Sequence, residues 1–224
     1  MSERMSRRPE PESMDVPEEV AAYAAADFAG VNQAFVDRLV ELVGPCENAL
    51  ALDLGVGPGD IPLRVVRARP KWRVVAVDAS YPMLEAAKRL ISEAKLSGSV
   101  QLVQADAKRC PFAADRFDVV YSNSILHHIT EVDLLWAEVK RVARPGATVL
   151  LRDLARPGSP EAARAIVEQH AGNESLVLQE EYYRSLLSSY TPDEVGQQLA
   201  RAGLGTLKVE MVSDRHFDVF GRVT

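Results

Sequence analysis

The sequence has few cysteines and no long apolar run, and both absences narrow the class of protein it can encode. Its 224 residues include two cysteines, Cys46 and Cys110, which lie far apart and form no Cys-x-x-Cys pair. This pattern favours a reduced, intracellular chain over one that is cross-linked by disulfides. Since no apolar stretch is long enough to cross a bilayer or to act as a signal peptide, we expect a cytoplasmic protein without a membrane span.

An excess of basic residues is also absent. The chain carries 32 acidic and 26 basic residues, for a net charge of −6. Its basic cluster, Arg4, Arg7 and Arg8, lies in a leading stretch rich in proline, glutamate and serine. Proteins that bind nucleic acid usually present a basic face, so we expect no nucleic-acid partner. The polar composition of residues 1–14 predicts a disordered tail, followed by a single domain over residues 15–224.

What the sequence contains, from residue 49 onward, is an alternation of short apolar runs with amphipathic stretches. The apolar runs, which are typical of buried strands, cover residues 49–55, 72–78, 100–106, 117–123 and 148–154. The amphipathic stretches between them have helical spacing. Alternation of this kind predicts an α/β protein whose parallel sheet is covered by helices on both faces.

Three additions to this core are visible. Residues 15–44 contain two helix-like runs, and residues 156–190 form a polar helical insertion that we interpret as a lid. The chain then ends in two strand-like runs joined at Asp214, and so short a turn predicts an antiparallel hairpin.

A glycine-rich loop follows the first predicted strand, in the stretch LDLGVGPGD. Gly55, Gly57 and Gly59 stand between the strand and the next helix. Glycine permits a sharp turn and the close approach of a ligand to the backbone, and a helix N-terminus offers free N–H groups. A simple connector between strand and helix is the alternative.

Two further strands end in a carboxylate. Asp78 ends the second strand and is placed to accept hydrogen bonds from a ribose diol, while Asp106 ends the third and can accept from an exocyclic amine. Each could instead cap a helix or a turn. Because the carboxyl ends of parallel strands lie at one edge of the sheet, their coincidence with the glycine loop favours a nucleoside-type ligand.

Taken together, five stretches resemble the class I S-adenosylmethionine-dependent methyltransferases, in particular the small-molecule branch that includes the ubiquinone/menaquinone biosynthesis methyltransferases. They are LDLGVGPGD, VVAVDASYPML, VQADAKRCPF, FDVVYSNSILHHI and RVARPGATVLL. The resemblance implies a Rossmann-like, doubly wound, seven-stranded sheet, mostly parallel with an antiparallel C-terminal strand. It also implies S-adenosylmethionine as the cofactor and a small molecule as the methyl acceptor. One departure is Ala147, which stands where the family has a second glycine after Pro145-Gly146.

The resemblance also assigns roles to individual residues. It places Asp53 near the ammonium of the cofactor, Gly55, Gly57 and Gly59 along its amino-acid end, Asp78 at the ribose, Ala79 and Met83 beside the adenine, Asp106 and Ala107 at the adenine amine, and Asn123 at the methionine moiety.

Methyl transfer from a sulfonium is an in-line displacement, so the protein needs a base only if the acceptor must lose a proton. His128 and His127, which follow the fourth strand, are the candidate bases. Each could instead cap the next helix or serve only in packing. Asp153, at the end of the fifth strand, lies on the same rim, and a structural ion pair with Arg152 is the favoured alternative to a role in the chemistry. The substrate pocket is predicted to include Tyr23, Asp153, Tyr182, Tyr183 and Arg184, and no metal is expected.

Two other functions stay open on the sequence alone. The chain could be a non-catalytic module that binds S-adenosylmethionine. It could also be a nicotinamide-dependent oxidoreductase, although Asp60 stands where the dinucleotide motif has its third glycine. The attacking atom of the acceptor is not predicted, and the oligomeric state stays open, with a homodimer as one alternative.

Overall fold

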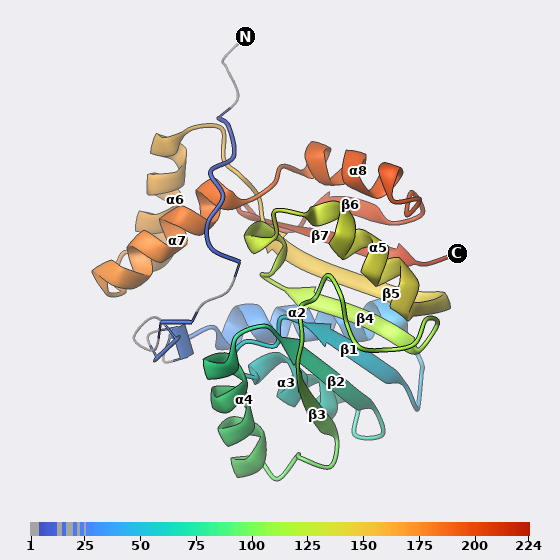
Figure 1. The fold of residues 1–224 in the computed structure, drawn as a ribbon. Coiled ribbons are helices and arrows are strands. Elements are labelled where there is room, and N and C mark those ends of the chain that lie inside the picture. Colours follow the sequence, from blue (N-terminus) through green and yellow to red (C-terminus); the bar gives the residue numbers. More distant parts are fainter. Residues whose placement is uncertain (1–4, 13–14, 17–19, 22, 25) are drawn as a thin grey trace.

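A seven-stranded sheet forms the centre of the molecule in the computed structural model, which describes residues 5–12, 15–16, 20–21, 23–24 and 26–224 (Figure 1). Its strands are β1 (Leu50–Leu54), β2 (Arg73–Asp78), β3 (Val100–Gln104), β4 (Phe117–Asn123), β5 (Ala143–Leu154), β6 (Lys208–Met211) and β7 (His216–Arg222). Their order is β3-β2-β1-β4-β5-β7-β6; β7 runs antiparallel to both of its neighbours and the other pairs are parallel. The predicted sheet, including its antiparallel end, is confirmed.

Helices cover both faces of the sheet. The helical elements are α2 (Ala29–Val43), α3 (Asp60–Ala68), α4 (Tyr81–Glu93), the 3₁₀ turn η1 (Leu126–His128), α5 (Val132–Val142), α6 (Pro160–Ala171), α7 (Leu176–Ser188) and α8 (Pro192–Arg201). Of these, α2, α3 and α4 pack on one face of the sheet, and α5 and α8 pack on the other. Alternate residues of β1 show the two layers. Ala51 packs with apolar residues of α2, α3 and α4, whereas Leu52 and Leu54 pack with those of α5 and α8.

Local sequence sets where several helices begin. The Ser80 hydroxyl accepts a hydrogen bond from the Met83 amide at the start of α4, and Pro82 lies in the first turn. Thr191 and Glu194 form a capping box at the start of α8. The Ser80 cap lies just beyond the carboxyl end of β2, and Thr191 follows Tyr190, which forms an isolated bridge with Ala155 just past β5.

One strand boundary differs from the prediction. The fifth strand was expected to begin near Thr148, after a turn at residues 144–146, but β5 begins at Ala143. Ala143 pairs with Phe117, and the register of β4 and β5 shifts between Phe117 and Val119. The predicted turn is therefore part of the strand, where it forms an irregularity of the β-bulge kind. A pattern of apolar residues does not predict such an irregularity.

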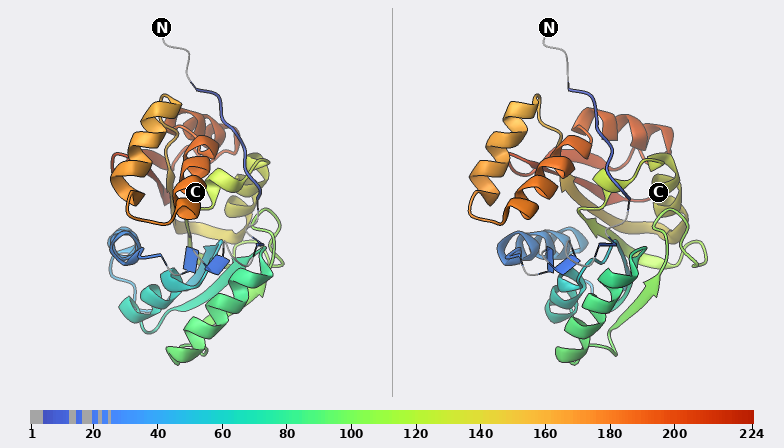
Figure 2. Two further views of the ribbon diagram at one scale, coloured as in Figure 1. Left: turned by 90° about the vertical axis from the view of Figure 1, so that its left-hand side faces the viewer. Right: turned by 60° about the vertical axis from the view of Figure 1, so that its left-hand side comes forward.

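The additions to the sheet gather at one side of the molecule. Figure 2 shows α6 and α7 packed against each other above the N-terminal elements. They enclose a small apolar cluster of their own that includes Leu154, Ala163 and Leu186. This agrees with the predicted helical insertion over residues 156–190. The first of the two helices expected in residues 15–44 falls largely on residues outside the described ones.

Residues 5–12, which we call the N-terminal segment, differ from the expectation of a disordered tail. They run beside α7 (Figure 1), and the Arg8 amide donates to the Leu187 carbonyl. The Arg7 guanidinium donates to the carbonyls of Ser188 and His127 and lies 4.2 Å from the centre of the Tyr190 ring. These partners lie far along the chain, so composition alone could not reveal them. Residues 1–4 and 13–14 of the predicted tail lie outside the described residues.

No helix in the described parts of the chain is both long enough and apolar enough to cross a bilayer.

Candidate active site

A cavity of about 990 Å³ opens at the carboxyl ends of the central strands. One side of it, which we call the glycine-loop end, is bordered by Gly57 and Asp78. The other, which we call the histidine end, is bordered by His127, His128 and Tyr182. Open parallel sheets bind ligands at this edge, so the cavity is the candidate site.

The three glycines of the loop have different roles. All three have positive φ, at +78° for Gly55, +52° for Gly57 and +94° for Gly59. A Cβ atom at Gly55 would lie 2.9 Å from the Ile125 side chain, and one at Gly59 would lie 3.0 Å from Ala87. A Cβ at Gly57 would meet nothing within 4 Å. Gly55 and Gly59 therefore allow close packing, whereas the bare backbone of Gly57 faces open space in the cavity.

Asp78 ties the loop to the end of β2. One carboxylate oxygen accepts a hydrogen bond from the Gly57 amide at 2.8 Å, and the other accepts from the Ser80 amide at 2.9 Å. Burial raises the pKa of Asp78, although these hydrogen bonds act against the rise. Asp78 also lines the cavity, so it braces the loop and still faces the space where a ligand would lie.

Asp53 lies beneath the loop and does not line the cavity. Its side chain is 1% exposed, and its Oδ2 atom has no hydrogen-bond partner among the described residues. Burial raises the pKa of Asp53 well above its usual range, and the charge of Asp78 adds to the rise. Its predicted contact with a ligand ammonium stays a prediction.

The other residues predicted to bind the cofactor do border the cavity. They are Ala79, Met83, Asp106, Ala107 and Asn123. Asp106 is braced by Lys108, whose amide donates to Oδ1 at 2.8 Å and whose Nζ lies 3.3 Å from Oδ2. The Asn123 amide donates to Asn32 of α2 at 3.4 Å. Gly55 and Gly57 line the cavity as well, whereas Gly59 does not.

At the histidine end, His127 and Asp153 form a buried pair. His127 Nδ1 lies 2.6 Å from Asp153 Oδ1, and Asp153 Oδ2 accepts from the Leu126 amide at 2.5 Å. Burial acts to lower the pKa of His127, but the charge of Asp153 outweighs it, so that pKa is raised. Burial acts to raise the pKa of Asp153, yet His127 keeps that pKa below its usual range.

The expected pairing of Asp153 with Arg152 is wrong. Arg152 instead makes a bidentate ion pair with buried Asp218 of β7, at 2.7 and 2.8 Å. Successive residues of β5 point to opposite faces of the sheet, so Arg152 faces α2 while Asp153 faces η1. The alternation of a strand therefore separates two neighbours that look like an ion pair in the sequence.

His128 is placed differently from His127. The two rings lie 4.2 Å apart, and His128 Nδ1 lies 3.1 Å from the Pro11 carbonyl oxygen. Burial, together with the neighbouring charge of His127, lowers the pKa of His128 to about 3. Of the two candidate bases, His127 has the closer carboxylate, Asp153 at 2.6 Å, whereas His128 Nδ1 lies 3.3 Å from Glu10.

The predicted substrate residues divide into two groups. Tyr23 and Tyr182 line the cavity, and burial raises the pKa of each to about 12. The Tyr182 hydroxyl has no hydrogen-bond partner among the described residues. Tyr183 and Arg184 do not line the cavity: Tyr183 packs under Arg164, and Arg184 pairs with acidic neighbours on α7. Asp153 lies behind His127 rather than at the cavity wall.

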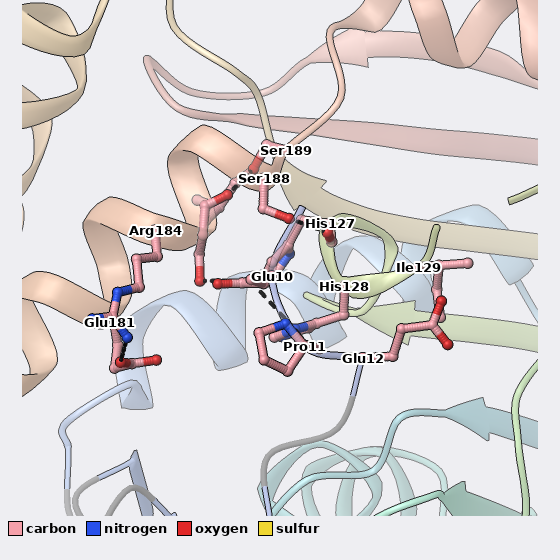
Figure 3. A network of polar contacts seen from close by, with 12 residues as sticks. Glu10, Pro11, Glu12, His127, His128, Ile129, Glu181, Arg184, Ser188 and Ser189 are labelled. Atoms are coloured by element: carbon pink, nitrogen blue, oxygen red, sulfur yellow. Dashed lines mark hydrogen bonds and ion pairs between the residues drawn. The ribbon is translucent and has the colours of Figure 1, made fainter. Parts of the chain in front are cut away.

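Several residues at the site were not predicted. Figure 3 shows Glu10 of the N-terminal segment between α7 and the two imidazoles. Glu12 accepts from the Thr130 amide at 2.9 Å and lies beside Lys108. No motif marks these glutamates, because their partners lie 96 or more positions away in the chain.

Comparisons with known proteins agree with the motifs. The family model described as methyltransferase domain matches residues 52–151. The demethylmenaquinone methyltransferase of Roseiflexus sp. (strain RS-1) is 32% identical over 131 residues, which cover 58% of this chain and 53% of that protein. The ubiquinone/menaquinone biosynthesis C-methyltransferase UbiE of Ectopseudomonas mendocina is 29% identical over 136 residues, covering 60% and 53%. The chain thus spans about half the length of the curated relatives it matches.

The fold itself has solved counterparts. The crystal structure of a SAM-dependent methyltransferase from Aquifex aeolicus superposes with a TM-score of 0.71 at 19% identity, covering 94% of this chain and 100% of that one. The resemblance to the S-adenosylmethionine-dependent methyltransferases is confirmed, by sequence over residues 52–151 and by fold over almost the whole chain.

Proposed function

We propose that this chain transfers a methyl group from S-adenosylmethionine to a small-molecule acceptor. The observation that carries the proposal is the bare backbone at Gly57, which faces the cavity and is held there by Asp78. The family match and the names of the relatives support the same reaction class.

The residues at the glycine-loop end fit the cofactor. A side chain at position 57 would project into open cavity space, and carboxylates at Asp78 and Asp106 border that space. We assign Asp78 to the ribose hydroxyls, Asp106 to the adenine amine, and Ala79 and Met83 to the adenine faces. When bound, the cofactor supplies a methyl group on a positively charged sulfur, which is a leaving group already activated by its charge.

The protein's task is then to align the acceptor and to exclude water. Tyr23 and Tyr182 give the cavity wall flat surfaces that suit a ring-shaped or apolar acceptor. The relatives named for quinone biosynthesis support an acceptor of that kind. Attack through carbon or oxygen would release a proton.

We assign the receipt of that proton to His127. Asp153 holds the Nδ1–H of His127, so Nε2 is the nitrogen left to accept a proton, and the carboxylate stabilises the imidazolium that forms. Glu10 lies 3.5 Å from Nε2, so an acceptor would have to displace this carboxylate to reach the nitrogen. His128, with its lowered pKa, is a weaker base and is assigned to the wall of the site.

Calorimetry with S-adenosylhomocysteine and, separately, with NADH tests the proposal. We expect saturable binding of S-adenosylhomocysteine and none of NADH. Binding of NADH alone would favour a nicotinamide-dependent oxidoreductase and would contradict the proposal. The cytoplasmic location predicted from the sequence belongs to this proposal, and it is supported by two cysteines that form no disulfide.

A further inference from the structure

Three side chains at the histidine end converge on one point. Glu10 Oε1 lies 3.5 Å from His127 Nε2 and 3.3 Å from His128 Nδ1, and all three atoms lie within 4.8 Å of one another. We call these residues the Glu10 cluster (Figure 3). The Glu10 side chain is only 8% exposed, and the Ser185 hydroxyl donates to its Oε1 atom at 3.2 Å. The N-terminal segment therefore places a nearly buried carboxylate beside two imidazoles.

Such an arrangement needs a positive charge at its centre. Because His127 Nδ1–H is given to Asp153, the lone pair of neutral His127 lies on Nε2 and faces the Glu10 carboxylate. A lone pair and a carboxylate oxygen at this separation repel each other unless a proton or a metal ion lies between them. A proton satisfies His127 alone, whereas a metal ion would also engage His128.

Two of the three spacings between the ligand atoms match a tetrahedral ion. With bonds of about 2.1 Å, ligand atoms around a tetrahedral zinc lie about 3.4 Å apart, close to the two distances measured from Glu10. Histidine ligands of metals usually donate their second ring N–H to a carboxylate, and Asp153 already accepts from His127 in this way. His128 Nδ1 would exchange its hydrogen bond to the Pro11 carbonyl for the ion.

We propose that Glu10, His127 and His128 bind a divalent transition-metal ion, with Zn²⁺ as the best match to two nitrogens and one oxygen. The Glu10 and Asp153 carboxylates balance the charge of the ion. A nearby cation is Arg7, whose guanidinium donates to the carbonyls of Ser188, His127 and Ile129. Hard ions such as Mg²⁺ prefer oxygen ligands and should bind poorly.

A metal site here goes beyond the proposed function, which requires no ion. A bound ion would occupy His127 Nε2, so it would replace the base and could itself lower the pKa of an acceptor hydroxyl. It would also fasten the N-terminal segment to η1 through Glu10. Binding of the ion does not depend on methyl transfer, so the two proposals can fail separately.

The test is calorimetric titration of the full chain with Zn²⁺, after treatment with a chelator and its removal. We expect one Zn²⁺ per chain, and no measurable binding of Mg²⁺. Glu10→Gln and His128→Gln should each weaken Zn²⁺ binding by at least about tenfold, because even outer-shell partners contribute 10–100-fold to metal affinity. Co²⁺ should give the visible absorption of a tetrahedral site in the wild type and lose it in both variants.

The matched control is His170→Ala. His170 of α6 also pairs with a carboxylate, because it lies 2.7 Å from Asp214 in the C-terminal hairpin, and Arg215 lies next to it. Its replacement should leave Zn²⁺ affinity unchanged. The proposal is overturned if the wild type does not bind Zn²⁺, or if His170→Ala weakens binding while the folded cluster variants do not. Should one cluster variant fail to fold by circular dichroism, the other decides the outcome.

Discussion

The two ends of the cavity differ in which parts of the chain form them. At the glycine-loop end, main chain shapes the site: Gly57 leaves its backbone bare, and its amide is bonded to Asp78. At the histidine end, charged side chains shape it, because η1, β5, α7 and the N-terminal segment each bring a polar group to one place. A ligand held by main chain depends on shape, whereas chemistry performed by side chains depends on protonation. Changes at the first end should therefore alter affinity, and changes at the second should alter rate.

The strongest test of this difference is Gly57→Val. The new side chain would enter the cavity and would also disfavour the φ of +52° that the loop requires. We expect S-adenosylhomocysteine binding to fall below detection in calorimetry, while the protein keeps a cooperative thermal transition. Gly98→Ala, at another open position away from the loop, is the matched control. Near-normal affinity of Gly57→Val would mean that the loop only connects β1 to α3.

The second test compares the two histidines in metal-free buffer. His127→Gln should lower turnover by about a hundredfold or more, as expected for loss of a general base, and should leave the affinity for S-adenosylhomocysteine unchanged. His128→Gln should have a smaller effect on turnover. Equal losses of turnover in the two variants, or a change in cofactor affinity alone, would contradict the assignment of His127 as the base.

The pH dependence of turnover sharpens the same comparison. A base must be neutral to accept a proton, so turnover should fall as the pH falls through the pKa of the residue that acts. Asp153 raises the pKa of His127, so the decline should begin above the ordinary histidine range. If His128 acted instead, turnover would hold until the pH approached about 3. The pH–rate profile of the wild type distinguishes the two.

A smaller effect is expected at Asp78. Asp78→Ala removes the carboxylate at the cavity wall and the hydrogen bond that holds the Gly57 amide. Each hydrogen bond to a charged group contributes about 1.5–3 kcal/mol, so the affinity for S-adenosylhomocysteine should fall by at least about tenfold. Unchanged affinity in a folded variant would show that Asp78 braces the loop without contacting the ribose.

The smallest effect is expected for Tyr182→Phe. The Tyr182 hydroxyl is buried and has no hydrogen-bond partner among the described residues, so its removal should leave the free energy of unfolding unchanged or slightly higher. Thermal denaturation without ligand measures this. A clear loss of stability would mean that the hydroxyl has a partner which the present contacts do not include.

The same contrast explains how far prediction from sequence could go. Gly55, Gly57 and Asp78 lie within one strand–helix–strand unit, so their spacing was enough to place them at a common edge. The positions of His127 and His128 after β4 followed from the same logic. The Asp153–His127 pair could not be predicted, because it depends on which face of β5 turns toward η1. The disordered tail was predicted from composition, yet Glu10 contacts residues more than a hundred positions away, and only folding brings them together.

Transfer of a labelled methyl group tests the central claim most directly. Wild-type protein is incubated with methyl-labelled S-adenosylmethionine and a protein-free metabolite extract, with Gly57→Val as the inactive control. The account predicts label in a small-molecule product with the wild type and none with the variant. If S-adenosylhomocysteine binds but no extract fraction acquires label, the chain is a binding module rather than an enzyme, and the account is contradicted.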